Sequence, residues 1–377
     1  MKLIYKTNMM NNFNFKKQAL VILSAFVLVL GACKKDKLPP IDPQPSATTG
    51  VYVLCEGPFG QINKSTITYY DIAAEAVEKD YFKKQNGINL GTGASALKQY
   101  GSKMYCVVTG DNDTDKDAYV EVISIASGKS LKRIPFFNDT KDFSPRNVVF
   151  YKGKAYVSGY DGFITKIDTA SLGIEARLEA GGAMEEMAIV NNKLYVTNSL
   201  HPYVSNPINS SVSVVDLNSF TKLKEIPVSF NANKIAASAS GDLFVVTRGQ
   251  YQPFIAPAFE KLSSVTDSKV QTYNYDLNAI TISGAKAYVI TGDYPSAIKT
   301  FNLANATIGA DFITDGTAVS NIYGVTVNPL SNDVYLADAT DYSTDGKFFC
   351  FGADGKKKFE FATGSIPQSA VFKYNYK

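Results

Sequence analysis

Short runs in which apolar and polar residues alternate recur from about residue 50 to the end of the chain. Seven of them place one aromatic residue among apolar neighbours, at Tyr52, Tyr105, Tyr156, Tyr195, Phe244, Tyr288 and Tyr335. Their separations range from 39 residues (Tyr156 to Tyr195) to 53 residues (Tyr52 to Tyr105). Alternation with a period of two predicts strands, and this repeat length is typical of four-stranded propeller blades.

Further alternating runs complete each repeat. A second run follows each aromatic run, for example residues 212–216, and an apolar run precedes copies two to seven, for example residues 146–151. Copy one lacks the preceding run, whereas residues 368–373 have this pattern and no partner after them. We therefore predict an all-β, seven-bladed propeller of four-stranded antiparallel blades, closed by the C-terminal strand, which pairs into blade one.

Two segments interrupt the repeats. Residues 201–210 form an insertion in blade four, and residues 248–269 form one in blade five if its second run is residues 270–274. Loops of this length are usually functional or disordered. The second insertion is interpreted either as a lid over a ligand or partner, or as a cap packed on the blade edge.

The N-terminal pattern differs from the rest. Lys16 and Lys17 precede an apolar run, residues 19–30, and the segment Leu30-Gly31-Ala32-Cys33 resembles a bacterial lipobox. This order predicts a lipoprotein signal peptide over residues 1–32, with Met9 or Met10 as alternative starts, and a lipid such as palmitate on Cys33. The proline-rich residues 33–49 are expected to form a flexible tether, and residues 50–377 a single propeller domain.

Composition supports this picture. Apolar residues make up 45% of the chain, which rules out disorder for most of it. The net charge of +3 comes from four lysines before residue 32, which leave 34 basic and 35 acidic residues beyond it, so nucleic-acid binding is not expected. Cys55, Cys106 and Cys350 are odd in number and widely spaced, and we expect them to be buried on strands without disulfides.

Residues for catalysis are sparse. The only histidine is His201, so zinc clusters, a Ser-His-Asp triad and histidine acid-base chemistry lack partners, and we expect neither an enzyme nor a resident cofactor. Asp111, Asp113 and Asp115 resemble the first half of a calcium loop. Lys116 and Val122 occupy the positions where that loop needs glycine and glutamate, so a solvated hairpin is the alternative to calcium.

Five short segments carry a family resemblance. Residues 193–199 and 211–216 are similar to the YVTN repeat of bacterial YncE-like propellers. Residues 50–60 after a lipobox, with 144–146 and 185–187, look like the lipid-anchored surface propellers of Gram-negative bacteria that include the BtuG-like group. That group captures cobalamin for a TonB-dependent transporter. Residues 54–56 and 337–339 depart from the Thr-Asn-Ser of the repeat, which weakens transfer of any one ligand.

The resemblance implies an outer-membrane protein, anchored in the bilayer through Cys33 at the cell surface or facing the periplasm. It also implies a TonB-dependent transporter as partner, a cobalamin-like, siderophore or glycan ligand, and an otherwise monomeric chain. Two alternatives remain: an adhesive or surface-layer scaffold, and a metal-dependent lactonase or lyase.

Propeller geometry predicts where a ligand binds. Loops that leave the aromatic runs and loops that enter the innermost strands emerge on one face around the central channel. Aromatic, amide and charged residues at these positions suit a large polar ligand. The candidate ligand-binding residues are Glu56, Phe59, Asn63, Arg146, Tyr160, Asp161, Glu185, Asn198, Arg248, Tyr251, Asp293, Tyr294, Tyr323, Asp338, Tyr342 and Gln368.

Overall fold

The computed structural model describes residues 44–112, 114–201 and 208–377. Within them, Pro45–Tyr376 form one compact unit. The predicted signal peptide and Cys33 lie outside the described residues, as do most of the predicted tether and Asp113 of the candidate calcium loop. No helix in the described ranges combines the length and apolar character needed to cross a membrane.

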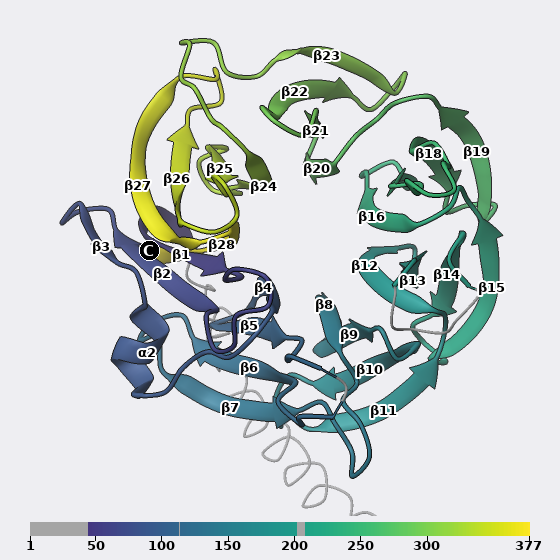
Figure 1. Cartoon of the computed structure of the whole chain (residues 1–377), viewed down its shortest axis with the longest axis horizontal. Coiled ribbons are helices and arrows are strands. Elements are labelled where there is room, and N and C mark those ends of the chain that lie inside the picture. The colour runs from purple at the N-terminus through teal and green to yellow at the C-terminus, as the bar shows by residue number, and fades with distance from the viewer. Residues whose placement is uncertain (1–43, 113, 202–207) are drawn as a thin grey trace, which may run out of the picture. The chain divides into compact units, whose positions relative to one another are not determined.

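Seven four-stranded antiparallel sheets, numbered here as blades I to VII, form a ring around one axis (Figure 1). From the innermost strand outward, blade I is β28 (Pro367–Tyr376), β1 (Pro45–Cys55), β2 (Thr66–Asp71) and β3 (Ala76–Glu78). Blade II is β4 (Ala94–Tyr100), β5 (Lys103–Val108), β6 (Tyr119–Ser124) and β7 (Ser130–Pro135). Blade III is β8 (Pro145–Tyr151), β9 (Lys154–Gly159), β10 (Phe163–Asp168) and β11 (Ile174–Glu179).

The other four blades follow the same order. Blade IV is β12 (Ala183–Val190), β13 (Lys193–Ser199), β14 (Ser211–Asp216) and β15 (Thr221–Pro227). Blade V is β16 (Ala232–Ala237), β17 (Asp242–Thr247), β18 (Ala258–Ser263) and β19 (Ser268–Tyr273). Blade VI is β20 (Ala279–Ser283), β21 (Lys286–Thr291), β22 (Ala297–Asn302) and β23 (Thr307–Asp311). Blade VII is β24 (Ile322–Val327), β25 (Val334–Asp338), β26 (Asp345–Phe351) and β27 (Lys357–Ser365).

The core lies in the seams between neighbouring blades. Seven hydrophobic clusters fill them, and each contains one of the seven aromatic residues of the sequence repeat. Tyr52, for example, packs on Leu97 and Met104 of the next blade. Each of the seven side chains is at most 3% exposed, and burial of one such side chain stabilises the fold by about 1.5–3 kcal/mol. The repeat therefore marks the residue that joins each blade to the next.

The predicted closure of the ring is confirmed. β28 pairs antiparallel with β1, with Val51 opposite Phe372 and Val53 opposite Ala370. Tyr335 of blade VII packs against these two strands in the last seam. The C-terminal strand thus supplies the innermost strand of blade I and pairs the inner edge of β1, which would otherwise be left open.

The structure differs from the sequence prediction in two places. β1 begins at Pro45 instead of Gly50, because β28 extends far enough to pair Tyr376 with Pro45. In blade V the second alternating run, residues 270–274, was assigned to the wrong strand. It largely coincides with the outermost strand β19, while β18 lies inside the predicted insertion of residues 248–269 and buries Phe259 and Leu262.

The three described cysteines and one side chain of the short helix are buried in the core. Cys55, Cys106 and Cys350 are free and buried on strands β1, β5 and β26, as the sequence predicted. Helix α2 (Tyr81–Asn86) connects blades I and II and inserts Phe82 into their seam. Asp80 accepts a hydrogen bond from the Lys83 backbone N–H, which caps the first turn.

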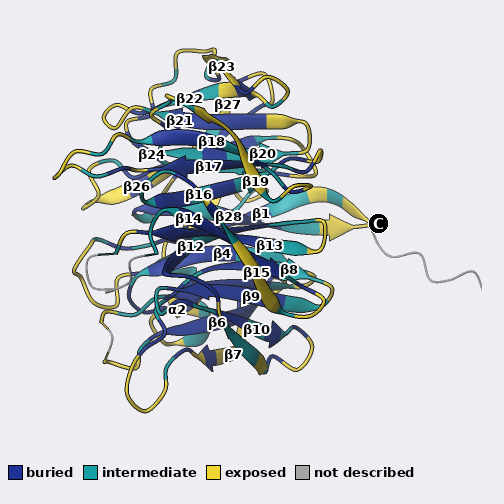
Figure 2. Ribbon diagram, turned by 90° about the vertical axis from the view of Figure 1, so that its right-hand side faces the viewer, coloured by how far each residue is buried: buried dark blue, intermediate teal, exposed yellow. Residues whose placement is uncertain are grey.

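The two faces of the ring differ in their loops. The proximal face is defined here as the side that carries Pro45 and Tyr376, and the distal face as the opposite side, where β1 ends at Cys55. Antiparallel pairing then places on the distal face the start of each innermost strand and the connection from each second strand to the third. In Figure 2 the C-terminal end of β28 lies on the right and the distal loops lie on the left.

Candidate functional site

A β-bulge at the distal end of six innermost strands orients one side chain toward the ring axis. The register shifts by one residue in all six, and in β12 the two residues Glu185 and Glu186 lie opposite the single residue Thr197 of β13. A bulge bends its strand and redirects the unpaired side chain. The bulged residues are Ser95, Arg146, Glu185, Glu186, Asn233, Tyr323 and Gln368.

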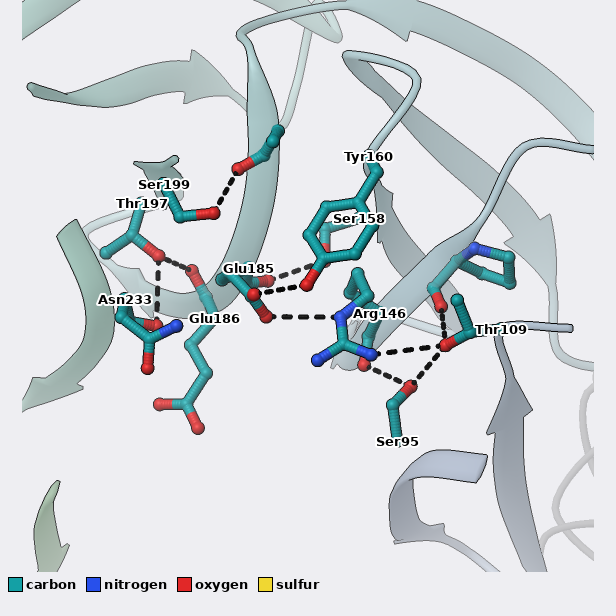
Figure 3. A network of polar contacts seen from close by, with 12 residues as sticks. Ser95, Thr109, Arg146, Ser158, Tyr160, Glu185, Glu186, Thr197, Ser199 and Asn233 are labelled. Atoms are coloured by element: carbon teal, nitrogen blue, oxygen red, sulfur yellow. Dashed lines mark hydrogen bonds and ion pairs between the residues drawn. The ribbon is translucent and has the colours of Figure 1, made fainter. Parts of the chain in front are cut away.

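Hydroxyl groups fix three of these bulges to the preceding blade. Thr109 Oγ1 donates to the carbonyl of Pro145 at 2.8 Å, and Ser158 Oγ donates to the carbonyl of Glu185 at 2.6 Å. Thr197 Oγ1 donates to the carbonyl of Asn233 at 3.4 Å. Each hydroxyl belongs to the distal end of a second strand or to the loop that follows it (Figure 3). The bulged backbone of the site is therefore hydrogen-bonded to the neighbouring blade.

Arg146, Glu185 and Tyr160 form the centre of the site. Arg146 Nε lies 3.2 Å from Glu185 Oε2, and the Tyr160 hydroxyl donates to Glu185 Oε1 at 2.5 Å. The guanidinium carbon lies 4.8 Å from the centroid of the Tyr160 ring. One carboxylate is therefore shared between a cation and a phenol, and the cation also contacts the face of that phenol's ring.

Electrostatics keep this pair ionised. Burial alone would lower the pKa of Arg146, but the Glu185 carboxylate, Tyr160 and Glu56 together outweigh burial and raise that pKa above its ordinary value. Burial alone would raise the pKa of Glu185, but Arg146, the Tyr160 hydroxyl and Lys234 together outweigh burial, so this pKa lies below its ordinary value. Burial, with Glu185 next, raises the pKa of Tyr160, which stays a protonated donor. The site thus presents fixed charges and a neutral hydroxyl.

A second set of polar side chains continues along the innermost strands. Lys234 Nζ lies 2.8 Å from Glu186 Oε1, and Lys98 Nζ donates to Asn147 Oδ1 at 3.0 Å. Burial lowers the pKa of Lys98. Asn233 Oδ1 is buried without a hydrogen-bond partner, and Figure 3 shows its side chain beside that of Glu186. An unsatisfied buried acceptor of this kind needs a donor from water or a ligand.

Blades I and VII supply another polar pair. The Tyr323 hydroxyl donates to Glu56 Oε2 at 2.8 Å, and the Tyr342 hydroxyl donates to Asn321 Oδ1 at 3.2 Å. Burial, with Glu56 next, raises the pKa of Tyr323 well above its ordinary value. The Tyr323 and Tyr342 rings meet edge to face at 5.7 Å. Tyr323, in the bulge of β24, thus bonds to Glu56 through its hydroxyl and contacts the distal loop of Tyr342 through its ring.

Exposed aromatic side chains gather on the distal loops. Phe59 is 101% exposed, Tyr251 89%, Phe254 75%, Tyr294 73% and Tyr342 45%. All five lie between the second and third strands of their blades, whereas Tyr376 is the corresponding exposed aromatic residue of the proximal face. They belong to blades V, VI, VII and I, and the Arg146 cluster belongs to blades III and IV. The distal face therefore has an aromatic part and a charged part.

Three candidate residues have side chains committed to the fold. Asn198 is fully buried and bonds to the Gly182 N–H and to Ser211 and Ser213. Asp338 is 3% exposed and accepts from backbone N–H groups of its own turn and of residues 320 and 321. Asp161 pairs with Arg177 of the outermost strand β11, away from the axis. These positions hold distal turns together, so we do not assign them to the ligand.

The other candidates lie on the distal face with varied surroundings. Asn63 and Arg248 are exposed, and Gln368 occupies the bulge of β28 with intermediate exposure. Asp293 Oδ1 lies 3.4 Å from Asn278 Nδ2. The candidate ligand-binding residues predicted from the sequence did not include Ser95, Glu186 and Lys234 of the innermost strands. Alignment of each innermost strand on the position of Arg146 would have found Ser95.

The acidic loop of blade II is held by its own hydrogen bonds. Asp117 accepts from the Asp111 N–H at 3.1 Å, and Asp115 accepts from Asn112 Nδ2 at 2.7 Å. In the described ranges, no group of three or more His, Cys, Asp or Glu side chains could hold a metal ion. Asp113 is outside those ranges, so the calcium prediction stays open.

Similar solved structures have the same architecture. A quinoprotein alcohol dehydrogenase-like protein from Bacteroides thetaiotaomicron superposes with a TM-score of 0.63 at 15% identity, over 86% of this chain and 78% of that one. Hydrazine synthase from Kuenenia stuttgartiensis gives 0.54 at 12% identity over 68% and 76%. A chain of a mitotic checkpoint complex gives 0.56 at 11% identity over 84% and 96%. No protein-family model and no curated protein matches the sequence. At these identities the likeness shows the propeller fold alone.

Proposed function

We propose that this propeller is a non-catalytic binding protein that captures a large polar ligand on its distal face. The observation that carries the proposal is the presence on that one face of five exposed aromatic side chains, on blades V, VI, VII and I, and of the bulged, half-buried polar groups of blades III and IV. Ligand sites in proteins combine aromatic surface with a few fixed polar groups in this way. Cobalamin-like molecules, siderophores and glycans remain the ligand classes to be tested.

The position of the first strand supports a role at a membrane surface. β1 starts at Pro45 on the proximal face, opposite the aromatic loops. A lipid on Cys33 would be joined to the propeller by the segment that precedes Pro45. A TonB-dependent transporter in the outer membrane is the proposed recipient of the ligand, on the strength of the lipobox and the YVTN-like repeats.

The chemistry of the site favours binding over turnover. Arg146 and Tyr160 both bond to the Glu185 carboxylate, so these three groups satisfy one another. The sequence contains a single histidine, in a loop of blade IV. A general base near neutral pH is thus not provided by these groups, because the pKa of Glu185 lies below its ordinary value and that of Tyr160 above it.

The experiment is a calorimetric screen of the purified propeller against cobalamins, ferric siderophores and soluble glycans. We expect saturable binding of one class, with the ligand recovered chemically unchanged after prolonged incubation. Turnover that copurifies with the protein and stops with chelator would support the lactonase or lyase alternative. Absence of binding in all three classes would support the scaffold alternative.

A further inference from the structure

The loop between β1 and β2, residues 56–65, is a firmly based projection on the distal face of blade I. Ser65 Oγ donates to the carbonyl of Glu56 at 2.6 Å, and the Asn63 N–H donates to Thr92 Oγ1 at 2.9 Å. Gly57 has φ +87°, and a Cβ there would lie 2.7 Å from the Lys64 carbonyl carbon. The base of the loop is therefore closed by backbone contact, and its tip is held in place.

The tip of this loop presents apolar surface to solvent. Phe59 is 101% exposed and Ile62 is 58% exposed. A phenyl ring in full contact with water contributes nothing to the stability of the fold through burial. An exposed aromatic side chain on a rigid loop instead has the properties of a binding residue, because little conformational entropy is lost when a ligand covers it.

Two hollows flank the loop. One, of about 360 Å³, is lined by Asn63 together with Tyr119 and Arg133 of blade II. The other, of about 300 Å³, is lined by Gln61 and Lys64 together with Ser343 and other residues of blade VII. Blade I lies between blades VII and II (Figure 1), so the loop separates the two hollows. A ligand that occupies both must be extended.

The lining of the second hollow is polar and balanced in charge. Two lysines, Lys64 and Lys79, face two carboxylates, Asp80 and Asp345, and Lys79 Nζ lies 2.7 Å from Asp345 Oδ2. Thr66 Oγ1 belongs to the same lining and is buried without a hydrogen-bond partner. Charges of both signs suit a neutral ligand with many hydroxyl groups better than an anion or a cation.

We propose that the distal rim of blade I binds a neutral saccharide chain, which crosses the loop of residues 56–65 between the two hollows and stacks one sugar ring on Phe59. Pyranose rings carry apolar C–H faces that pack on aromatic rings and hydroxyl edges that bond to amide, ammonium and carboxylate groups. An extended chain also fits two hollows on opposite sides of one projection. This site shares Phe59 with the aromatic part of the distal face. It uses none of the axis residues, so it can be tested separately from the ligand site proposed for them.

Affinity electrophoresis tests this proposal. The propeller is run in native gels that contain amylopectin, mixed-linkage β-glucan, arabinoxylan, galactomannan or dextran, one polysaccharide in each gel. We expect at least one polysaccharide to retard the wild-type protein. Phe59→Ala should weaken that binding at least about tenfold, the usual effect of removing a central aromatic contact. Val265→Ala, which removes an 80% exposed apolar side chain on the proximal face, should leave it unchanged.

Three results would overturn the proposal: no retardation by any of the five polysaccharides, equal retardation of Phe59→Ala and wild type, or dimerisation in sedimentation experiments that disappears with Phe59→Ala. The last result would identify the loop as a contact between copies of this chain. Arg146→Ala separates the two sites. Saccharide binding that survives in Arg146→Ala supports the rim site whatever the axis site binds, and saccharide binding that is lost in Arg146→Ala contradicts it.

Discussion

The Tyr160 hydroxyl donates to one oxygen of Glu185 at 2.5 Å, while Arg146 Nε lies 3.2 Å from the other oxygen. Tyr160 and Arg146 both belong to blade III and Glu185 to blade IV, so this shared carboxylate joins two blades at the axis. The same three groups that brace the ring are thus displayed on the distal face. Bracing of the two blades affects the free energy of unfolding, whereas ligand binding affects affinity, so the two roles can be measured separately.

The ion pair at the seam of blades III and IV should show energetic coupling. Arg146→Ala or Glu185→Ala alone leaves the partner charge only slightly exposed and should cost about 1.5–3 kcal/mol of unfolding free energy. The double variant should cost less than the sum, with a coupling energy of about 1–3 kcal/mol from denaturant unfolding. Additive losses would show that the pair contributes nothing to bracing.

The acid stability of the fold should depend on Glu185. Its folded-state pKa lies below the ordinary value of 4.5, because Arg146, the Tyr160 hydroxyl and Lys234 together outweigh the effect of burial. A depressed carboxylate pKa contributes stability above the unfolded pKa, and this contribution is lost as the pH falls through the folded value. The stability difference between wild type and Glu185→Gln should therefore shrink from pH 7 to pH 3, in denaturant titrations with the exposed Glu75→Gln as control. A difference that stays constant over this range contradicts the assigned charge state.

Closure of the ring should depend on β28. Deletion of residues 368–377 removes nearly the whole innermost strand of blade I and uncovers the edge of β1 together with Tyr335. We expect loss of the cooperative thermal transition and association through the open edge. Deletion of Lys377 alone, which lies beyond β28, is the control. An unchanged melting transition in the longer deletion would show that β28 does not close the ring.

The predicted lipid anchor can be tested directly. A thioether to diacylglycerol requires a thiol, so Cys33→Ser should move the protein from the membrane fraction to the soluble fraction and abolish incorporation of labelled palmitate. Cys55→Ser is the matched control, because Cys55 is buried in β1. Membrane fractionation and palmitate labelling of Cys33→Ser at the wild-type level would refute the anchor.

The sequence was sufficient for the fold because each blade repeats one buried aromatic residue. Tyr52 and its six equivalents each fill one seam, so their spacing counts the blades. In blade V the sequence prediction took the fourth strand, β19, for the third, because exposed β19 has the same alternation as a half-buried third strand. The true third strand, β18 with Phe259, lies within the segment interpreted as an insertion.

The site was less predictable, because side-chain direction depends on the bulges. Arg146 and Glu185 point to the axis since each occupies a register shift, which no residue pattern specifies. Asn198 belongs to an equally polar motif, yet it lies in the regular pairing of β13 with β14 and is fully buried. Hydrogen bonding to Gly182, Ser211 and Ser213 accounts for its polarity without any ligand.

Binding at the distal face is tested most directly by calorimetry on single variants, with the ligand that the screen identifies. Arg146→Ala, Tyr160→Ala and Tyr294→Ala should each weaken binding by about 1–3 kcal/mol through loss of a charge-assisted hydrogen bond or an aromatic contact. Tyr376→Ala on the proximal face should bind as the wild type does, and circular dichroism should show the same fold for all four. Full affinity in the three distal variants, or lost affinity in Tyr376→Ala, would contradict the ligand site proposed for the Arg146 cluster and the aromatic loops of the distal face.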